Sequence, residues 1–254
     1  MDIKKYLARI GLNEVPQADL ESLRLLQESH LYTVPFENLD IHLGRRIIID
    51  YDRIFEKVVD QKRGGFCYEL NGLFFHLLEA LGYQVKRLSA RVYQDERQAF
   101  SHEYDHMTLC VHLDGKDWLT DVGFGRFSFA PLCIGMNEIQ SDGKRQYKFV
   151  PYEADKDYVS VMHLEEDGNW KDGYIFSMKA RAAEEFIPMC HYQQTFPESH
   201  FLKGKMCTIP TKEGRITLNE KSLKITKAGE VEETEIGNDE VFFQHLKTYF
   251  GIAF

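Results

Sequence analysis

The segment RGGFCYELN, residues 63–71, places a single cysteine directly after a glycine pair and directly before a periodic apolar run. Apolar residues spaced three and four apart lie on one face of a helix. The run that shows this spacing is Leu70, Leu73, Phe74, Leu77, Leu78 and Leu81. Gly82 follows at the position where helices commonly end in a left-handed residue. The pattern predicts a helix with a buried face and with Cys67 in its first turn.

The residues before the glycine pair are also typical of helices. One helix is predicted over residues 3–10 and ends at Gly11, a second runs from about Asp19 to His30, and a third begins near Asp50. Together with the helix after Cys67, they predict a helical bundle over residues 1–82.

From residue 83 onward, short alternating or apolar runs are separated by turn residues, which is typical of antiparallel strands. Strands are predicted over residues 85–92, 106–113, 118–122, 147–150, 158–164 and 174–176. This spacing favours a small, strongly curved barrel over residues 83–180. A strand pair, 215–218 and 223–226, and a closing helix capped by Asn238 or Asp239 predict an α/β lid over residues 181–254. The expected fold class is α+β.

Composition excludes several kinds of protein. The 254 residues carry a formal net charge of −9, with no clustered basic face for nucleic acid. No segment has the eighteen or so apolar residues of a membrane span, and the first residues do not resemble a signal peptide, so we expect a cytoplasmic protein without a membrane partner. The five cysteines form no CxxC pair, which argues against disulfides and against a bound metal.

A helix N-terminus can make a cysteine nucleophilic, because its unpaired N–H groups and positive dipole end favour the thiolate. Cys67 has that predicted position, and Gly64 and Gly65 permit a close approach of backbone or substrate. The alternative is that Cys67 is a structural cysteine buried at a tight helix entry.

A hairpin further along the chain supplies a histidine and a carboxylate. If Asp114 and Gly115 form a two-residue turn, Leu113 faces Lys116, and counting back along the ladder sets His106 opposite Gly123. Asp121 then lies diagonally across from His106 on the same face, within side-chain reach. Cys67, His106 and Asp121 would form a relay in which the ring takes the thiol proton and the aspartate orients the ring. The alternative is a satisfied core histidine and an aspartate that caps a turn.

These stretches resemble the arylamine N-acetyltransferase family. RGGFCYELN, the HMTL strand and DVGFG carry the resemblance, and YLARIG, VPFENLDI and RITL extend it over nearly the whole chain in the expected order. It implies a helical bundle, a β-barrel and an α/β lid, the first two similar to cysteine proteases. It also implies that Cys67, His106 and Asp121 transfer an acetyl group from acetyl-CoA, the co-substrate, to an arylamine, arylhydrazine or N-hydroxyarylamine, without a metal.

The resemblance further implies a cleft lined by aromatic residues, for which Phe36, Tyr68 and Phe124 match, and an ion pair between Glu37 and Arg63. Two departures concern specificity. Arg126 stands where many relatives have a further glycine, which makes it a candidate to meet a CoA phosphate or an acidic acceptor; the alternative is a solvated surface arginine. Only part of the family pattern fits residues 191–201, beyond which Lys203 and Lys205 are candidates to attract the donor's phosphates.

Two other enzyme classes are consistent with these residues. An amide synthase shares the architecture, and a thiol hydrolase or transglutaminase-like enzyme uses Cys, His and Asp in the same chain order.

Overall fold

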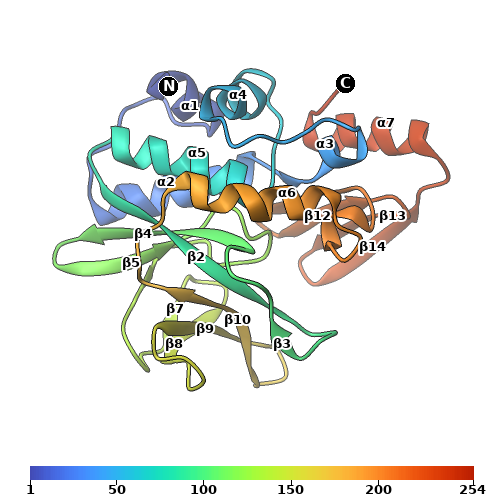
Figure 1. Ribbon diagram of the computed structural model, residues 1–254. Coiled ribbons are helices and arrows are strands. Elements are labelled where there is room, and N and C mark those ends of the chain that lie inside the picture. Colours follow the sequence, from blue (N-terminus) through green and yellow to red (C-terminus); the bar gives the residue numbers. More distant parts are fainter.

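The computed structural model describes residues 1–254 and begins with a group of helices on one side of a β-barrel (Figure 1). Asp19 caps the second helix by accepting a hydrogen bond from the Ser22 amide, and Cys67 is the first residue of the helix predicted after the glycine pair. The helical segments are α1 (Ile3–Arg9), α2 (Leu20–Thr33), α3 (Leu39–His42), α4 (Tyr51–Phe55), a π-helical turn (Glu56–Asp60) and α5 (Cys67–Ala80).

Helix α5 is almost entirely buried and joins the helices to the barrel. Its apolar stripe, predicted from periodicity, forms one core with α1, α2 and the barrel strand β4 (His106–Leu113). Leu109 and Val111 of β4 face this core, whereas Cys110 faces the barrel interior. Because side chains alternate along a strand, β4 contributes to both the helical core and the barrel core.

The helical core contains one histidine whose ring has no hydrogen-bond partner. His30 is fully buried, both ring nitrogens are unpaired, and its ring lies against Tyr6 and Phe74. Burial, assisted by the nearby Arg9 charge, lowers the pKa of His30 to about 3. The ring is therefore neutral in the folded protein at pH values where an unfolded chain would protonate it.

We expect this histidine to weaken the fold in acid. Because the unfolded pKa is about 6.5, the unfolded chain binds an extra proton between pH 6.5 and pH 3, and stability falls with decreasing pH in that window. His30→Leu should reduce the loss of unfolding free energy between pH 7 and pH 5 by about 2 kcal/mol. Urea unfolding at the two pH values measures this, and equal losses in both proteins would contradict it.

The central sheet is a nearly closed antiparallel barrel in the order β6-β5-β4-β2-β10-β9-β8-β7, with β3 paired to β2. The side chain of Gln140 in β7 both donates to and accepts from the backbone of Cys133 in β6, which joins the two edges. The remaining strands are β2 (Gln84–Gln94), β3 (Ala99–Phe100), β5 (Lys116–Thr120), β6 (Leu132–Cys133), β7 (Gln140–Ser141), β8 (Gln146–Pro151), β9 (Tyr158–Leu164) and β10 (Trp170–Ser177).

The barrel differs from the prediction in its short strands, in the end of β5, and in β10, which begins four residues earlier than predicted, at Trp170. The two-residue strands β3, β6 and β7 carry too few residues to show an alternating pattern. Strand β5 ends at Thr120, two residues earlier than predicted, because Asp121 turns the chain: its carboxylate accepts the amide hydrogen of Gly123.

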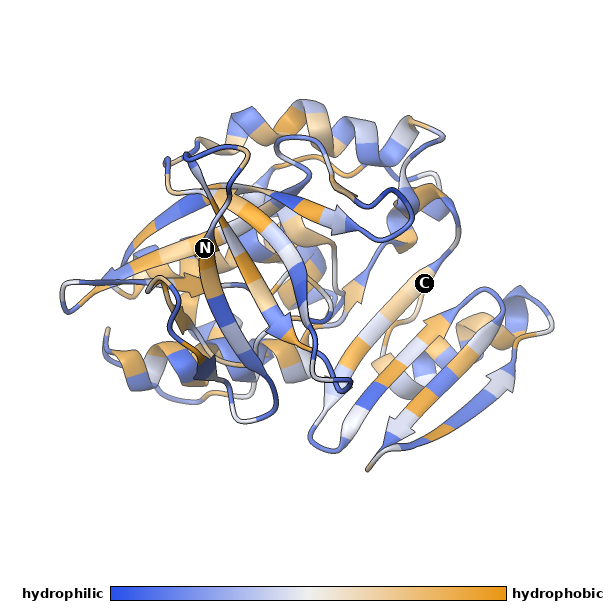
Figure 2. Cartoon of the chain, turned by 90° about the horizontal axis from the view of Figure 1, so that it is seen from below, coloured by the Kyte–Doolittle hydropathy of each residue, from blue (hydrophilic) through white to orange (hydrophobic).

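The C-terminal part is a five-stranded antiparallel sheet with helices. Its first strand, β1 (Phe36–Glu37), comes from the N-terminal third of the chain and pairs with β11. The predicted strand pair 215–218 and 223–226 is present, and Asn238 caps the closing helix as one of the two residues predicted for that role. Figure 2 shows hydrophobic and hydrophilic residues alternating along these strands. The segments are a 3₁₀ turn (Ala183–Phe186), α6 (Ile187–Thr195), a 3₁₀ turn (His200–Leu202), β11 (Met206–Thr211), β12 (Gly214–Asn219), β13 (Ser222–Lys227), β14 (Glu230–Glu235) and α7 (Asp239–Phe250).

No helix combines the length and the apolar character needed to cross a bilayer.

Candidate active site

The two glycines before Cys67 lie where neighbouring atoms leave no room for a side chain. A Cβ on Gly64 would lie 1.9 Å from the carbonyl oxygen of Pro35, and a Cβ on Gly65 would lie 2.7 Å from the Glu69 carboxylate. Glu69 in turn accepts the amide hydrogen of Phe66, the N-cap residue of α5, at 3.1 Å. The groups that approach these glycines closely are thus the Pro35 backbone and the Glu69 carboxylate. Their contacts fix the start of α5 and the position of Cys67.

His106 and Asp121 meet as the hairpin register predicts. Leu113 pairs with Lys116, the ladder runs back to Leu109 and Thr120, and His106 Nε2 lies 2.6 Å from Asp121 Oδ2. Both side chains are buried. Burial favours a neutral carboxyl, but the charge and hydrogen bond of His106 outweigh it and hold the pKa of Asp121 below its usual range. Asp121 is therefore a carboxylate aimed at the ring.

Two further residues that the sequence did not single out hold this carboxylate. Asn71 of α5 donates to Asp121 Oδ1 at 2.8 Å and to the carbonyl of Met107 at 2.6 Å, and it accepts the amide hydrogen of Val122. Tyr174 of β10 donates to Asp121 Oδ2 at 3.0 Å. The one signal in the sequence is that Asn71 is a polar residue next to Leu70, the first residue of the apolar run of α5.

Gly123 of the DVGFG stretch permits this packing. A Cβ at that position would lie 2.8 Å from Cys67 Cα and 2.8 Å from Asn71 Nδ2. The loop after Asp121 therefore lies directly against the start of α5, which places the hairpin and the nucleophile helix in contact.

The pKa of the Cys67 thiol is raised, whereas a helix N-terminus by itself predicts a lowered one. Cys67 is 3% exposed, and burial raises its pKa well above the usual value; the backbone of Met107 opposes this, and Asp105 and Asp121 add to it. A lone thiolate is disfavoured here, so the sulfur must ionise together with a proton acceptor. The structure shows no hydrogen bond between Sγ and the ring of His106, whose Nε2 is engaged by Asp121. The ring nitrogen left for the thiol proton is Nδ1.

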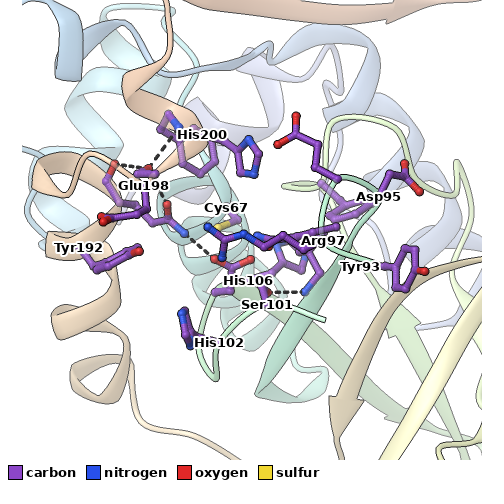
Figure 3. A pocket seen from close by; sticks show the side chains of 18 of the residues that line it. Cys67, Tyr93, Asp95, Arg97, Ser101, His102, His106, Tyr192, Glu198 and His200 are labelled. Carbon is purple, nitrogen blue, oxygen red and sulfur yellow. Dashed lines mark hydrogen bonds between the residues drawn. The ribbon is translucent and has the colours of Figure 1, made fainter. Parts of the chain in front are cut away.

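Cys67 and His106 line one cavity of about 420 Å³ (Figure 3). Phe36 and Phe124 line it too, as predicted, and the ring of Phe124 packs edge-on against His106 at 5.1 Å between centroids. The polar part of the wall, much of it labelled in Figure 3, consists of Tyr93, Asp95, Glu96, Arg97, Ser101, His102, Asp105, Tyr192, Gln193, Glu198, Ser199 and His200.

Two residues predicted to contact substrate lie outside the lining. Tyr68 is fully buried, because its ring packs edge-on against Phe66 and its hydroxyl donates to the carbonyls of Tyr104 and Asp105. Arg126 is exposed and lies outside the lining. Burial, together with the charges of Arg126 and Arg145, lowers the pKa of Arg215 to about 10. Neither side chain reaches the cavity in this structure.

A buried network of charges supports the start of α5. The predicted ion pair of Glu37 and Arg63 is present at 2.7 Å, and Lys57 joins it, with Nζ at 2.7 Å from Glu69 and 2.8 Å from Asp40. Burial disfavours the charged form of Lys57, but the three carboxylates outweigh it and raise its pKa above the usual value. Lys57 and Arg63 thus compensate the charges of three carboxylates, those of Glu37, Asp40 and Glu69.

The candidate phosphate-binding lysines already have acidic partners. Lys203 lies 3.4 Å from Glu96, and Lys205 lies 2.5 Å from Asp239. No group of three or more His, Cys, Asp and Glu side chains is arranged to hold a metal ion.

A buried cysteine at a helix N-terminus, beside a histidine–carboxylate pair on an antiparallel barrel, defines the class of thiol-dependent enzymes with a cysteine-protease-like core. A family model described as N-acetyltransferase matches residues 19–254. The Arylamine N-acetyltransferase of Mycolicibacterium smegmatis is 32% identical over 99% of this chain and 92% of its own, and Arylamine N-acetyltransferase 1 of Homo sapiens is 31% identical over 84% and 79%. The chain belongs to the arylamine N-acetyltransferase family.

Solved structures agree with this assignment. The Mycobacterium marinum arylamine N-acetyltransferase in complex with CoA superposes with a TM-score of 0.88 and 29% identity over 99% of this chain and 93% of its own. The Bacillus cereus arylamine N-acetyltransferase with a Cys-His-Glu catalytic triad superposes with a TM-score of 0.92 and 25% identity, covering both chains completely. In the present chain the carboxylate beside the histidine is that of an aspartate.

Proposed function

We propose that this protein transfers an acetyl group from acetyl-CoA to an arylamine, arylhydrazine or N-hydroxyarylamine by way of acetylated Cys67. The observation that carries the proposal is that His106, which lines the same cavity as Cys67, contacts the buried carboxylate of Asp121 at 2.6 Å. Family membership supports the same chemistry, and the CoA complex of the M. marinum relative supports acetyl-CoA as the donor.

In the first half-reaction the Cys67 proton moves to His106 Nδ1, and Sγ attacks the thioester carbonyl carbon. The bond from that carbon to the CoA sulfur breaks, and the CoA thiolate takes the proton from the imidazolium. Because burial opposes a lone thiolate, the sulfur ionises only as a pair with the ring, and Asp121 stabilises the charged ring.

In the second half-reaction the acceptor nitrogen attacks the acetyl carbon of Cys67 and passes its proton to His106. The carbon–Sγ bond then breaks, the acetylated acceptor leaves, and the thiolate remains beside the imidazolium. We assign Phe36 and Phe124 to the apolar wall against which a flat aromatic acceptor packs.

The experiment that tests the proposal is mass spectrometry of the protein after brief exposure to acetyl-CoA. We expect one acetyl group, located on Cys67 and lost when an aromatic amine is added, and we expect no adduct on a Cys67→Ala variant. An adduct elsewhere, or one indifferent to amines, would refute it.

We also propose that the protein is cytoplasmic.

A second measurement separates acetyl transfer from the activity of a thiol hydrolase. With p-nitrophenyl acetate as donor, a transferase should release p-nitrophenol faster when an arylamine is present. Equal rates with and without the amine favour the hydrolase. The matched relatives are named as acetyltransferases, which favours transfer over both the hydrolase and the amide synthase.

A further inference from the structure

The cavity wall carries a second carboxyl group, that of Asp105, which the proposed mechanism does not use. Asp105 immediately precedes His106 and lines the same cavity as Cys67. Tyr68, the residue after Cys67, donates its hydroxyl to the backbone carbonyl of Asp105 at 3.1 Å. The backbone of Asp105 is therefore tied to the helix that carries Cys67 and, through the chain, to His106.

The partners of this carboxyl are neutral. Gln193 of α6 donates to Asp105 Oδ1 at 2.5 Å, and the Gln193 side-chain carbonyl accepts from Ser199 at 2.7 Å. Asp105 takes part in no ion pair with lysine or arginine; the basic groups that act on its charge are the rings of His106 and His102. A half-buried carboxylate without a cation is costly, and such groups are concentrated at functional sites.

The effect of Asp105 reaches the sulfur. Burial is the main cause of the raised pKa of Cys67, and the charge of Asp105 adds to it. Burial raises the pKa of Asp105 as well, despite its hydrogen bonds to Ser101 and Gln193. A group that binds at Cys67 therefore meets the field of this carboxylate in a weakly solvated place, where screening is small.

The other charged residues that line the cavity are exposed, and two of them have ion-pair partners. Asp95 pairs with Lys171 at 2.7 Å, and Glu96 pairs with Lys203 at 3.4 Å. Arg97 and Glu198 carry opposite charges and are both exposed. Among the carboxylates that line the cavity, that of Asp105 is the one that is both half-buried and without a lysine or arginine partner.

We propose that Asp105 sets the charge preference of the acceptor site, favouring neutral and cationic aromatic amines and disfavouring anionic ones such as aminobenzoates. This inference rests on the proposed acetyl transfer. The physical basis is direct repulsion: two like charges about 7 Å apart at an effective dielectric constant near 20 repel strongly enough to change a rate about tenfold or more.

The test compares two acceptors of the same shape, 4-aminobenzoate and its neutral amide, 4-aminobenzamide, at pH 8. In a two-step exchange, kcat/KM for the acceptor reports on the acetyl-enzyme alone, so CoA binding does not enter. Asp105→Asn retains an oxygen for Gln193 and removes the charge. We expect the amide-to-benzoate ratio of kcat/KM to fall about tenfold, because the benzoate reacts faster.

Asp117→Asn is the matched control, because it removes a carboxylate of the same hairpin that does not line the cavity, and it should change the ratio by less than about twofold. A structural role of Asp105 would alter both acceptors equally, and an unchanged ratio in Asp105→Asn would overturn the proposal. If the wild-type protein acetylates neither amine, the proposed function fails instead.

A measurement on the wild-type protein keeps the proposal testable if Asp105→Asn does not fold. The cationic 4-aminobenzamidine completes the series, and each rate is divided by the rate of the same amine with a free acetyl thioester, which removes the effect of amine reactivity. The normalised rates should decrease from cation to neutral amide to anion. An anion that reacts as fast as the amide would overturn the proposal.

Discussion

Asp121→Asn should lower the rate of Cys67 acetylation by about 10³–10⁴-fold while the protein stays folded. Asp121 accepts hydrogen bonds from Asn71 and Gly123 through Oδ1, and an asparagine oxygen can keep both. Its amide nitrogen would then face His106 and donate to Nε2. The ring would carry its proton on Nδ1, where it can no longer accept the proton of the thiol.

Single-turnover release of CoA measures the effect. Asp117→Asn is a matched control, because Asp117 contacts His112 at 2.9 Å in the same hairpin, at its exposed end. The control should acetylate at the wild-type rate. A loss below about tenfold in Asp121→Asn, with an unchanged melting temperature, would remove Asp121 from the mechanism.

Lys57→Met should destabilise the fold by about 3–5 kcal/mol. The substitution leaves the carboxylates of Glu37, Asp40 and Glu69 with Arg63 as their one cation, in a site where the five side chains are 0–11% exposed. Breaking a buried ion network by removing one partner leaves an uncompensated charge, which costs far more than losing a surface pair.

The pH dependence of this loss has a definite sign. Burial already raises the pKa of Glu69 in the intact protein, and removal of Lys57 strengthens that shift. A carboxyl whose folded pKa lies above its unfolded value destabilises the fold as pH rises, so the deficit of the variant should grow from about pH 4 toward neutrality. Urea unfolding at pH 5 and pH 8 measures it.

Lys5→Met serves as the comparison, because Lys5 pairs with Asp60 on the surface, where the two side chains are 59% and 43% exposed. It should cost less than about 1 kcal/mol. Equal effects of the two substitutions would show that the buried network does not stabilise α5.

The elements that the sequence predicted well are those defined by local patterns. Periodicity located α5 and put Cys67 in its first turn, and the Asp-Gly turn set the register that brings His106 to Asp121. The two-residue strands β6 and β7 have no such pattern, and their place follows from contacts such as that of Gln140 with Cys133. The division at residues 82 and 180 stays a prediction, and β1 shows that the C-terminal sheet takes a strand from before the first boundary.

The sequence alone determined the family, the succession of a helical part, a strand-rich part and a mixed final part, and the three residues proposed for catalysis, because each depends on residues close together in the chain or on specific motifs. The tertiary structure decided which side chains surround them. Asn71 meets Asp121 across 50 residues, Asp105 meets Gln193 across 88, and Tyr68 turns away from the cavity that Phe124 enters. Such contacts depend on how α5, the barrel and α6 pack together, and so does the burial that raises the pKa of the Cys67 thiol. Packing between distant segments leaves no periodic trace in the chain.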